Sequence, residues 1–252
     1  MKVVSWNVNG LRSVRRKGHE DFLKEFGADF VCLQEIKAQK EYMNEGLFAE
    51  ASTHCYFNDA DKKGYSGVAI YTKRKPIKMW QDIGHKRFDS EGRFLRLDYD
   101  DFTLINIYIP HGGRDKENLA YKLEVYDCLL RYLKDIQENN IIMVGDFNIA
   151  HDEIDLARPK DNHDNIMFTR EERAQIDKLL GFGFLDTFRE IYKDGGHFTW
   201  WPYRLDLRER NIGWRIDYIF VSRSIADNLR EVAILKNTAG SDHCPITAKL
   251  VI

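Results

Sequence analysis

Polar side chains that could bind a cation or move a proton stand at the ends of several apolar runs. Asn7 follows the first run of the chain, and Glu35 and Asp146 each end a later one. Asp242 and His243 stand side by side just before the apolar residues that close the sequence. Buried strands that stop on carboxylates and carboxamides predict one polar site at one end of a sheet-rich core.

The first chemistry that these residues suggest is divalent metal binding. Glu35 is a hard oxygen ligand, and Asn7, Asn9 and Asp242 could add further oxygens. A site with few carboxylates and some carboxamides suits Mg²⁺, which keeps several waters and takes other ligands from substrate phosphate. Zinc would instead require His and Cys ligands at close spacing, so this oxygen-rich set does not suit it.

The second chemistry is hydrolysis at phosphorus. Asp146 could hold and deprotonate a water, and Asn148 could donate to a non-bridging phosphate oxygen. His243 could donate to the same phosphate if a carboxylate such as Asp217 kept its imidazole in the right tautomer. Together the residues predict metal-assisted hydrolysis of a phosphodiester.

Each residue also has a purely structural interpretation. The Asp242–His243 pair could form a cap or a surface hydrogen bond, and Glu35 and Asp146 could cap helices. Tyr108 could be a core aromatic residue with a satisfied hydroxyl. Polar residues at several independent strand ends favour the functional interpretation, because all of them would otherwise have to be polar by accident.

The strands that must position these groups are visible as apolar runs rich in Val, Ile, Phe and Tyr. Strands are predicted at residues 2–8, 29–34, 67–72, 94–99, 102–109, 141–147, 215–221 and 246–252. Several runs are nearly continuous rather than alternating, which is typical of strands covered on both faces.

Helices are predicted between the strands. Leu119, Leu123, Tyr126, Leu130 and Leu133 form one apolar stripe of a helix. A second helix is predicted over 170–181, because Thr169 precedes two glutamates in its first turn.

These elements predict one α/β domain of stacked layers over residues 1–252, without a linker or repeat. The run before Asn7 resembles the run before Asp146. That similarity would fit two similar sheets packed face to face, with the site at their shared edge.

Composition leaves the partner open. The 38 Lys and Arg nearly balance the 40 Asp and Glu, so nucleic acid would need a local basic face. The four cysteines form no metal or disulfide pattern and predict free thiols in a reducing compartment. No apolar run approaches the roughly 20 residues that span a bilayer. With no signal-peptide pattern at the start, an intracellular, cytoplasmic protein without membrane contact is expected.

Short motifs occur at residues 6–12 (WNVNGLR), 33–35 (LQE), 64–67 (GYSG), 106–110 (NIYIP), 145–148 (GDFN), 153–156 (EIDL), 211–217 (NIGWRID) and 240–245 (GSDHCP). Taken together, they resemble the exonuclease III family of abasic-site endonucleases, within the deoxyribonuclease I-like phosphoesterase superfamily. They follow the family order over nearly the whole chain. Related phosphatases and sphingomyelinases are not expected to share the stretch at 210–217.

The resemblance implies a four-layer α/β/β/α sandwich, in which two packed mixed sheets are flanked by helices. It also implies Mg²⁺ at the edge of the sheets, with Mn²⁺ as a substitute. Glu35 would be the main metal ligand, with Asn7 and Asp242 nearby and Asn9 as a further candidate. Asp146 and Asn148 could instead hold a second metal.

The resemblance implies catalytic roles that agree with the chemistry above. Asp146 would orient or activate the attacking water, and Asn148 would steady the charge that develops on phosphorus. The Asp217–His243 pair would contact the scissile phosphate. Tyr108 would assist that phosphate or the leaving oxygen.

The resemblance also implies DNA contacts. Arg12 and Tyr65 match backbone-contacting positions, Arg114 a groove-inserting arginine, Asn162 and Asn165 polar positions beside a flipped sugar, and Trp200 and Trp214 the walls of an abasic pocket. Arg204 is a further candidate. A sugar without a base is cheap to extrude, because nothing must be unpaired. The alternatives are core packing for the tryptophans and a solvated loop around Arg204.

Three positions depart from the family pattern. Asn9 stands where many relatives carry aspartate, which would weaken metal binding there. His111 stands where asparagine or glutamine is usual and could titrate near neutral pH. Trp200 replaces a commoner phenylalanine and would narrow the pocket. These departures bear on substrate preference and not on the reaction.

The prediction is a monomeric DNA repair nuclease that cuts duplex DNA 5′ to an abasic site with Mg²⁺. Trimming of blocked 3′ ends and 3′→5′ exonuclease activity would accompany it. One alternative is a phosphatase of the same superfamily that acts on a small phosphoester. The other is a DNA-lesion binding protein without catalysis.

Overall fold

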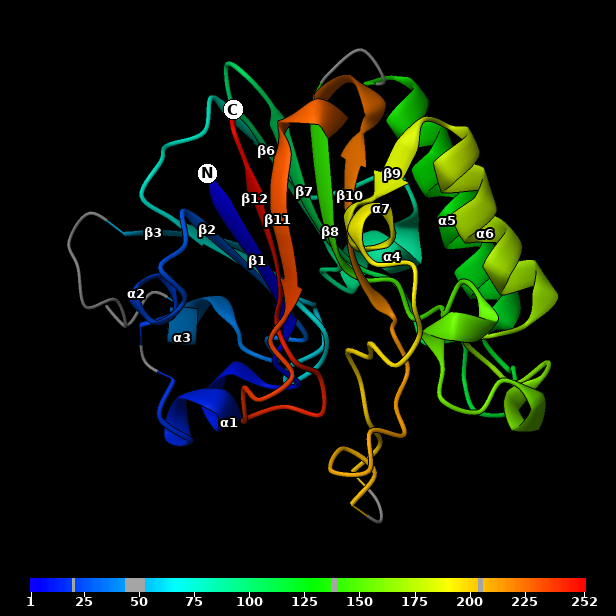
Figure 1. Ribbon diagram of the computed structural model, residues 1–252. Helices are drawn as coiled ribbons and strands as arrows, with labels where there is room; N and C mark the ends of the chain where they lie inside the picture. Colours follow the sequence, from blue (N-terminus) through cyan, green and yellow to red (C-terminus); the bar gives the residue numbers. More distant parts are fainter. Residues whose placement is uncertain (20, 44–52, 137–139, 204–205) are drawn as a thin grey trace.

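The computed structural model describes residues 1–19, 21–43, 53–136, 140–203 and 206–252. Its centre is a pair of six-stranded mixed sheets (Figure 1). The first sheet has the order β11-β12-β1-β2-β4-β3. Its strands are β1 (Lys2–Asn7), β2 (Phe30–Gln34), β3 (His54–Asn58), β4 (Val68–Thr72), β11 (Leu229–Ile234) and β12 (Ile246–Leu250).

The second sheet has the order β5-β6-β7-β8-β10-β9. Its strands are β5 (Lys78–Trp80), β6 (Phe94–Asp98), β7 (Thr103–Tyr108), β8 (Ile141–Asp146), β9 (Phe184–Asp186) and β10 (Asp217–Ser222). Each sheet has one parallel pair at its centre, β1 with β2 and β7 with β8. The other strand pairs are antiparallel, so both sheets are mixed, as predicted.

The two sheets repeat one topology. In each, an antiparallel strand flanks the central parallel pair, β12 beside β1 and β10 beside β8. Matched by both position in the sheet and order along the chain, β1 of the first sheet corresponds to β7 of the second, and β2 corresponds to β8. Two similar sheets are confirmed, but the run before Asp146 is β8, which matches β2, so the similarity between the runs before Asn7 and Asp146 does not mark equivalent strands.

The side chains of the strands pack on both faces of each sheet, which gives four layers: helices, two sheets and helices. Along β1, Val3 packs between the sheets, while Val4 and Trp6 pack on the outer face. Alternate residues of one strand thus enter two different cores, which explains why the apolar runs are nearly continuous. In Figure 1 the short helices α1 (Leu11–Arg16), α2 (Phe22–Phe26) and α3 (Lys40–Met43) lie on the side of the first sheet.

The outer face of the second sheet packs against α5 (Leu119–Lys134) and α6 (Arg170–Gly181), seen on the right of Figure 1. α6 begins after Thr169, whose hydroxyl accepts from the backbone N–H of Glu172 in a capping box, as the sequence predicts. The remaining helical segments are α4 (Lys86–Ser90), α7 (Thr187–Ile191), η1 (Glu153–Asp155), η2 (Lys160–Asn162) and η3 (Arg223–Asn228).

The buried face of α5 differs from the predicted stripe. Val125 and Leu129 are fully buried, whereas Leu123 and Leu130 are only partly covered. The charged residue Lys122 lies in the buried face, although an apolar residue would be expected there. The helix and the buried positions Tyr126 and Leu133 are confirmed, but the buried face is centred on Val125 and Leu129 rather than on Leu123 and Leu130.

All eight predicted strands are confirmed, with ends that differ by one or two residues. β3, β5, β9 and β11 were not predicted. β5 and β9 have three residues each, and β3, β5, β9 and β11 form the edges of the sheets. A strand that is short or open on one side carries a weak apolar pattern.

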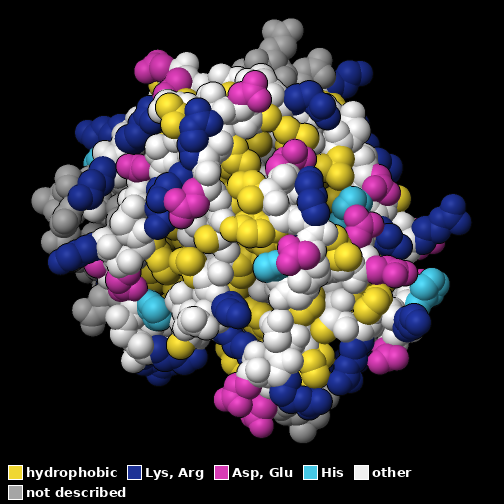
Figure 2. Space-filling model, viewed as in Figure 1, with side chains coloured by type: hydrophobic (Ala, Val, Ile, Leu, Met, Phe, Trp, Pro, Cys, Tyr) yellow, Lys and Arg dark blue, Asp and Glu magenta, His cyan; other side chains and the backbone are white. Residues whose placement is uncertain are grey.

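The described cysteines are free thiols, three buried and one, Cys55, partly so. No helix among the described residues combines the length and apolarity that crossing a membrane requires. Figure 2 shows lysines and arginines spread over one face with acidic side chains between them. This face therefore carries no field of a single sign.

Candidate functional site

Polar side chains from both sheets meet at one edge. They are Asn7 at the end of β1, Glu35 just after β2, Tyr108 at the end of β7, Asp146 at the end of β8, Asp217 at the start of β10 and His243 shortly before β12. β10 and β12 run antiparallel to their neighbours β8 and β1, so their starts lie beside the neighbours' ends. Strand ends that are distant in sequence thus form one site.

The backbone turns sharply where the strands end. Asn9, Glu35 and Asn148 have positive φ angles of 45°, 50° and 51°. Such angles are uncommon for residues with a side chain, and they cluster at functional sites. Gly145 has φ 149°, and a Cβ there would lie 1.8 Å from the carbonyl oxygen of Ile107. Only glycine therefore allows β8 to approach β7 directly before Asp146.

Asn7 joins the two sheets. Its buried amide nitrogen donates to Glu35 Oε1 at 3.0 Å and to Asp146 Oδ2 at 2.9 Å. Its amide oxygen accepts from the backbone N–H of Asn9 at 3.0 Å. Asn7 thus presents its nitrogen to both carboxylates and holds them at a fixed separation.

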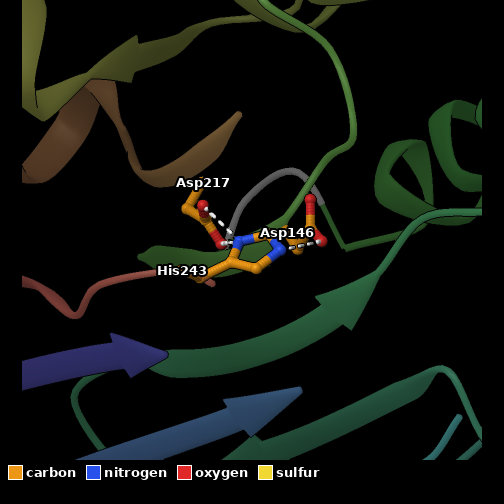
Figure 3. Close-up of side chains that lie close together, drawn as sticks. All are labelled: Asp146, Asp217 and His243. Carbon is orange, nitrogen blue, oxygen red and sulfur yellow. Dashed lines mark hydrogen bonds and ion pairs between the residues drawn. The ribbon is translucent and has the colours of Figure 1, made fainter. Parts of the chain in front are cut away.

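His243 lies between two carboxylates (Figure 3). Its Nδ1 is 2.9 Å from Asp217 Oδ2, and its Nε2 is 3.8 Å from Asp146 Oδ2. Burial lowers the pKa of His243, but the charges of Asp217 and Asp146 outweigh burial and raise the pKa to about 10. The imidazole is therefore protonated at neutral pH, with both nitrogens acting as donors.

Asp146 is nearly fully buried and titrates together with its neighbours. Desolvation and the negative charge of Asp217 raise the pKa of Asp146 to about 7, against the lowering effect of His243 and Asn7. A carboxyl group with this environment is suited to accept a proton near neutral pH.

Glu35 is contacted on both oxygens. Oε1 accepts from Tyr108 Oη at 2.7 Å as well as from Asn7. Oε2 lies 2.9 Å from Nζ of Lys37, and the same ammonium group donates to Asn9 Oδ1. Burial raises the pKa of Glu35, but Lys37 and the hydrogen bonds lower it further, so the pKa falls below its usual value. Glu35 is therefore a carboxylate.

Asp242 lies beside Asn9, and both of its carboxylate oxygens accept hydrogen bonds. Its Oδ1 accepts from Asn9 Nδ2 at 2.9 Å and from Ser241 Oγ at 3.2 Å. Its Oδ2 accepts from the indole N–H of Trp200 at 3.1 Å. A phenylalanine in place of Trp200 could not make this hydrogen bond. The tryptophan at this position, where the family pattern has phenylalanine, therefore connects the aromatic side chain to Asp242.

The oxygen donors fit a hard divalent cation. Glu35 Oε2 and Asn9 Oδ1 already converge on one positively charged group, the ammonium of Lys37, and carboxylate and amide oxygens suit Mg²⁺ or Mn²⁺. Ligand atoms of Asp146, Asp217 and His243 also lie within 4.8 Å of one another. That second cluster is already joined by the contacts of the imidazole, so Glu35 is the better centre for a metal.

Asn148 is held next to Asp146. Its amide nitrogen donates to the carbonyl of Ile109 at 2.8 Å and lies 3.4 Å from Asp146 Oδ2. Its own carbonyl accepts from Nζ of Lys122 at 2.6 Å, and Lys122 also pairs with buried Glu172 at 2.5 Å. To donate to a phosphate, Asn148 would have to exchange one of its present acceptors.

Two tryptophans line the side of the site next to His243. The backbone of Trp200 forms single β-bridges with the backbones of Trp214 and His243. The ring centroids of Trp200 and His243 are 6.3 Å apart. Both indoles are partly buried against a small apolar cluster. Thr199 Oγ1 accepts from the backbone N–H of Asp217 at 3.2 Å, which fixes the start of β10.

The remaining predicted DNA contacts lie around this edge or outside it. Arg12 is exposed on α1 with its guanidinium 4.5 Å from the ring centre of Tyr42, and Arg114 is exposed after β7. Asn165 donates to Asn162 at 3.1 Å, so these two side chains contact each other. Tyr65 accepts from Arg93 at 2.8 Å. Among the described residues, no hydrogen bond or ion pair joins Arg12 or Arg114 to the polar side chains at this sheet edge, and Arg204 lies outside the described part of the chain.

Sequence reasoning missed Lys37, Lys122 and Arg93. Lys37 follows Glu35 by two positions, a signal that could have drawn attention to it. The only sequence signal for Lys122 is that a charged residue interrupts the apolar pattern of its helix. Buried Arg93 donates to Tyr65 and to the carbonyl of Tyr108 at 3.3 Å, and no sequence pattern marks it.

Comparison with known proteins gives consistent matches. Residues 4–243 match the model of the endonuclease/exonuclease/phosphatase family. An exodeoxyribonuclease of Bacillus subtilis (strain 168) is 41% identical over 98% of both chains. The DNA repair nuclease APEX1 of Danio rerio is 38% identical over 100% of this chain and 83% of its own length.

The fold has a similarly close counterpart among solved structures. An AP endonuclease from Archaeoglobus fulgidus superposes with a TM-score of 0.91 at 28% sequence identity, covering 100% of both chains. The two packed sheets flanked by helices are therefore the architecture of an AP endonuclease, as the motifs predicted.

Proposed function

The chain belongs to the endonuclease/exonuclease/phosphatase family and is a DNA repair nuclease, and we propose that it cuts duplex DNA on the 5′ side of an abasic site. The cut leaves a 3′-hydroxyl and a 5′-deoxyribose phosphate. The same site removes blocking groups from 3′ ends and degrades DNA in the 3′→5′ direction, as the exodeoxyribonuclease relative suggests. The enzyme acts as a monomer, as one domain over residues 1–252, and inside the cell, where its DNA substrate lies.

One observation carries this proposal. Asp217, His243 and Asp146 form a connected chain, and Asn7 links that chain to Glu35. A proton acceptor, a positively charged donor and a cation-binding carboxylate thus lie at one sheet edge. Such a set serves the attack of water on a phosphodiester.

In the proposed reaction the protein removes one proton from the attacking water and offsets the negative charge that grows on the phosphate. Asp146 accepts a proton from the attacking water, whose oxygen forms a bond to phosphorus. The protonated imidazole of His243 faces the non-bridging oxygens and offsets their growing negative charge. Asp217 keeps that imidazole charged and oriented. The bond from phosphorus to the 3′ oxygen breaks, and the departing oxygen takes up a proton from solvent to become the 3′-hydroxyl.

The donor set around Glu35 is proposed to hold Mg²⁺, for which Mn²⁺ substitutes. Glu35 is the main ligand, Asn9 a second, and Asp242 and Asn7 stand next to it through hydrogen bonds. When bound, the ion would act as a Lewis acid on the phosphate. Tyr108 orients Glu35 by donating to its other oxygen.

The DNA contacts are proposed around the same edge. Trp200 and Trp214 form the wall against which an extruded abasic sugar packs, with Asn162 and Asn165 as polar neighbours. Arg12, Tyr65 and Arg114 contact the duplex backbone or groove. Backbone contacts position the duplex, while the pocket selects the lesion.

The test uses a duplex with a single tetrahydrofuran abasic analogue, incubated with Mg²⁺ or with EDTA. Wild-type protein is expected to make one nick 5′ to the analogue with Mg²⁺ and none with EDTA. Asp146→Asn is expected to bind the duplex and leave it uncut. Asp177→Asn, a surface change on α6 at a side chain that contacts His151, serves as the matched control and should cut normally.

Absence of any metal-dependent nick at micromolar enzyme would contradict the proposal. If wild-type protein and Asp146→Asn both bound the abasic duplex and neither cut it, the protein would be a lesion-binding protein. If only small phosphoesters were hydrolysed and duplex did not bind, it would be a phosphatase. A panel with abasic, 3′-phosphate and mismatched ends would divide the endonuclease from the exonuclease activity.

A further inference from the structure

The segment after β2 is held rigidly against two neighbouring segments. The backbone N–H of Lys37 donates to Ser66 at 2.8 Å, that of Ile36 to Gly67 at 3.1 Å, and that of Gly10 to Glu35 at 2.8 Å. Both Glu35 and Lys37 have positive φ angles, of 50° and 49°. This backbone turns the Lys37 side chain back over Glu35.

The ammonium group of Lys37 contacts the Glu35 oxygen that does not accept a hydrogen bond from Tyr108 or Asn7. Oε1 already accepts from Tyr108 and Asn7, whereas Oε2 is contacted by Lys37 at 2.9 Å. The same group binds Asn9 Oδ1, whose amide is fixed because its nitrogen donates to Asp242. Lys37 thus contacts two oxygens that a divalent cation would need.

We propose that Lys37 is an internal counter-ion, which holds the cation position between Glu35 and Asn9 in the metal-free enzyme and is displaced when the metal binds. The inference rests on the proposed metal site and adds a residue to it. A divalent cation on the same oxygen would repel the ammonium group, so the two cations compete for Glu35 Oε2. The side chain has a path out, since a third of it is exposed (33%).

Two consequences follow from this exchange. Lys37 neutralises Glu35 in the metal-free site, so this partly buried carboxylate does not need a metal to balance its charge. Metal affinity is lower than the oxygens alone would give, because each binding event must break the contacts of Lys37. Removing the ammonium group should therefore strengthen metal binding.

The test measures Mn²⁺ binding directly, without DNA, from the electron paramagnetic resonance signal of free Mn²⁺. Lys37→Met keeps the length of the side chain and removes its charge, and we expect it to bind Mn²⁺ roughly tenfold more tightly, or about 1.4 kcal/mol. Lys17→Met is the matched control. Lys17 donates to the carbonyl of Gly240, two residues before Asp242, and does not contact Glu35. Its removal should change Mn²⁺ affinity far less.

A second measurement uses the wild-type chain. N-hydroxysuccinimide acetate labels free lysine amines, and mass spectrometry reads each position. Lys37 is expected to react slowly without metal and faster as Mn²⁺ is added, with the same half-saturation as the resonance titration. Labelling of Lys17 should stay constant.

The outcomes separate the inference from the proposed function. If Lys37→Met binds Mn²⁺ no better than Lys17→Met, or if labelling of Lys37 does not rise with Mn²⁺, the counter-ion role is wrong while metal-dependent cleavage still stands. If the wild-type protein binds no Mn²⁺ and cuts abasic DNA equally well in EDTA, the proposed metal requirement fails and the inference fails with it.

Discussion

His243 is the residue whose surroundings define the chemistry. Its ring is nearly fully buried, yet the carboxylates of Asp217 and Asp146 on either side keep it charged. A buried imidazolium between two acids can offset charge on a phosphate only while its orientation is fixed. Asp217 provides that orientation through two contacts, at 2.9 and 3.2 Å from Nδ1.

Asp217→Asn should therefore impair catalysis much more than binding. The amide cannot stabilise the imidazolium, so kcat on an abasic duplex is expected to fall by roughly 10²- to 10⁴-fold. KM should change little, because Asp217 is buried. Steady-state kinetics would measure both, with Asp177→Asn as the control. A rise in KM as large as the fall in kcat would instead assign Asp217 to DNA binding.

At the scale of elements, helices stabilise the strand ends through buried ion pairs. Lys122 of α5 and Glu172 of α6 are fully buried, and the ammonium group also holds the carbonyl of Asn148. Near β10, the carboxylate of Asp155 accepts from Arg215 at 2.7 and 3.0 Å and from Arg189 at 2.5 Å. These pairs fix the loops that carry Asn148 and Asp217.

Lys122→Met should leave the charge of Glu172 buried and unpaired, which costs about 3–5 kcal/mol of unfolding free energy. In the double variant Lys122→Met/Glu172→Gln, most of that stability should return, because no unpaired charge remains. Cleavage should stay reduced, because the carbonyl of Asn148 still lacks its donor. Urea unfolding and kcat are measured on the same samples. Full recovery of kcat in the double variant would show that Lys122 acts on stability alone.

The Asp155 pair predicts a dependence of stability on acid. Burial raises the pKa of Asp155, but Arg215 and Arg189 outweigh it and lower the pKa to about 2. A lowered carboxyl pKa contributes stability that is present above the ordinary value of about 4 and is lost as the pH falls through the folded value. The stability advantage of wild type over Asp155→Asn should shrink by about 2 kcal/mol between pH 5 and pH 2.

Denaturant unfolding at a series of pH values checks this prediction. Asp177→Asn, whose side chain is largely exposed at 68%, should show no such trend. A difference between wild type and Asp155→Asn that stays constant down to pH 2 would mean that Asp155 does not titrate in the folded protein as described.

At the scale of the whole molecule, the site depends on two sheets of the same topology meeting at one edge. The first sheet brings Asn7 and Glu35, and the second brings Tyr108, Asp146 and Asp217. Charges of both signs alternate over the face in Figure 2, and the formal net charge is −2. With a formal net charge of −2, duplex binding is expected to depend on local cations rather than on the net charge of the molecule.

Arg12→Ala should consequently weaken duplex binding and lower the slope of log K against log salt by about one, as expected when one phosphate contact is lost. kcat at saturating duplex should be unchanged. Arg230→Ala is the control, because Arg230 lies on β11 next to Leu229, which pairs with Leu250 at the end of the sheet far from the site. Fluorescence anisotropy at several salt concentrations measures the slope. Equal slopes for wild type and Arg12→Ala would remove Arg12 from the DNA interface.

The sequence by itself determined the central strands, the two long helices and the polar residues at the strand ends. These signals are local: an apolar run, a capping box after Thr169, or an aspartate at the end of a buried strand can be read without knowing what lies opposite. The edge strands β3, β5, β9 and β11 gave no such signal, because their pairing partners rather than their own residues make them strands.

Only the tertiary structure decided which polar atoms face one another. Asn7 points its nitrogen at two carboxylates, Lys37 covers the open oxygen of Glu35, and Lys122 lies in the core of a helix pattern that predicts an apolar residue. The Asn7 contacts join elements far apart along the chain, whereas the Lys37 contact depends on the backbone turn between two residues that are close in sequence. Their strength depends on distance and burial, which a linear pattern does not contain, so the chemistry could be predicted from residue types but the positions of its charges could not.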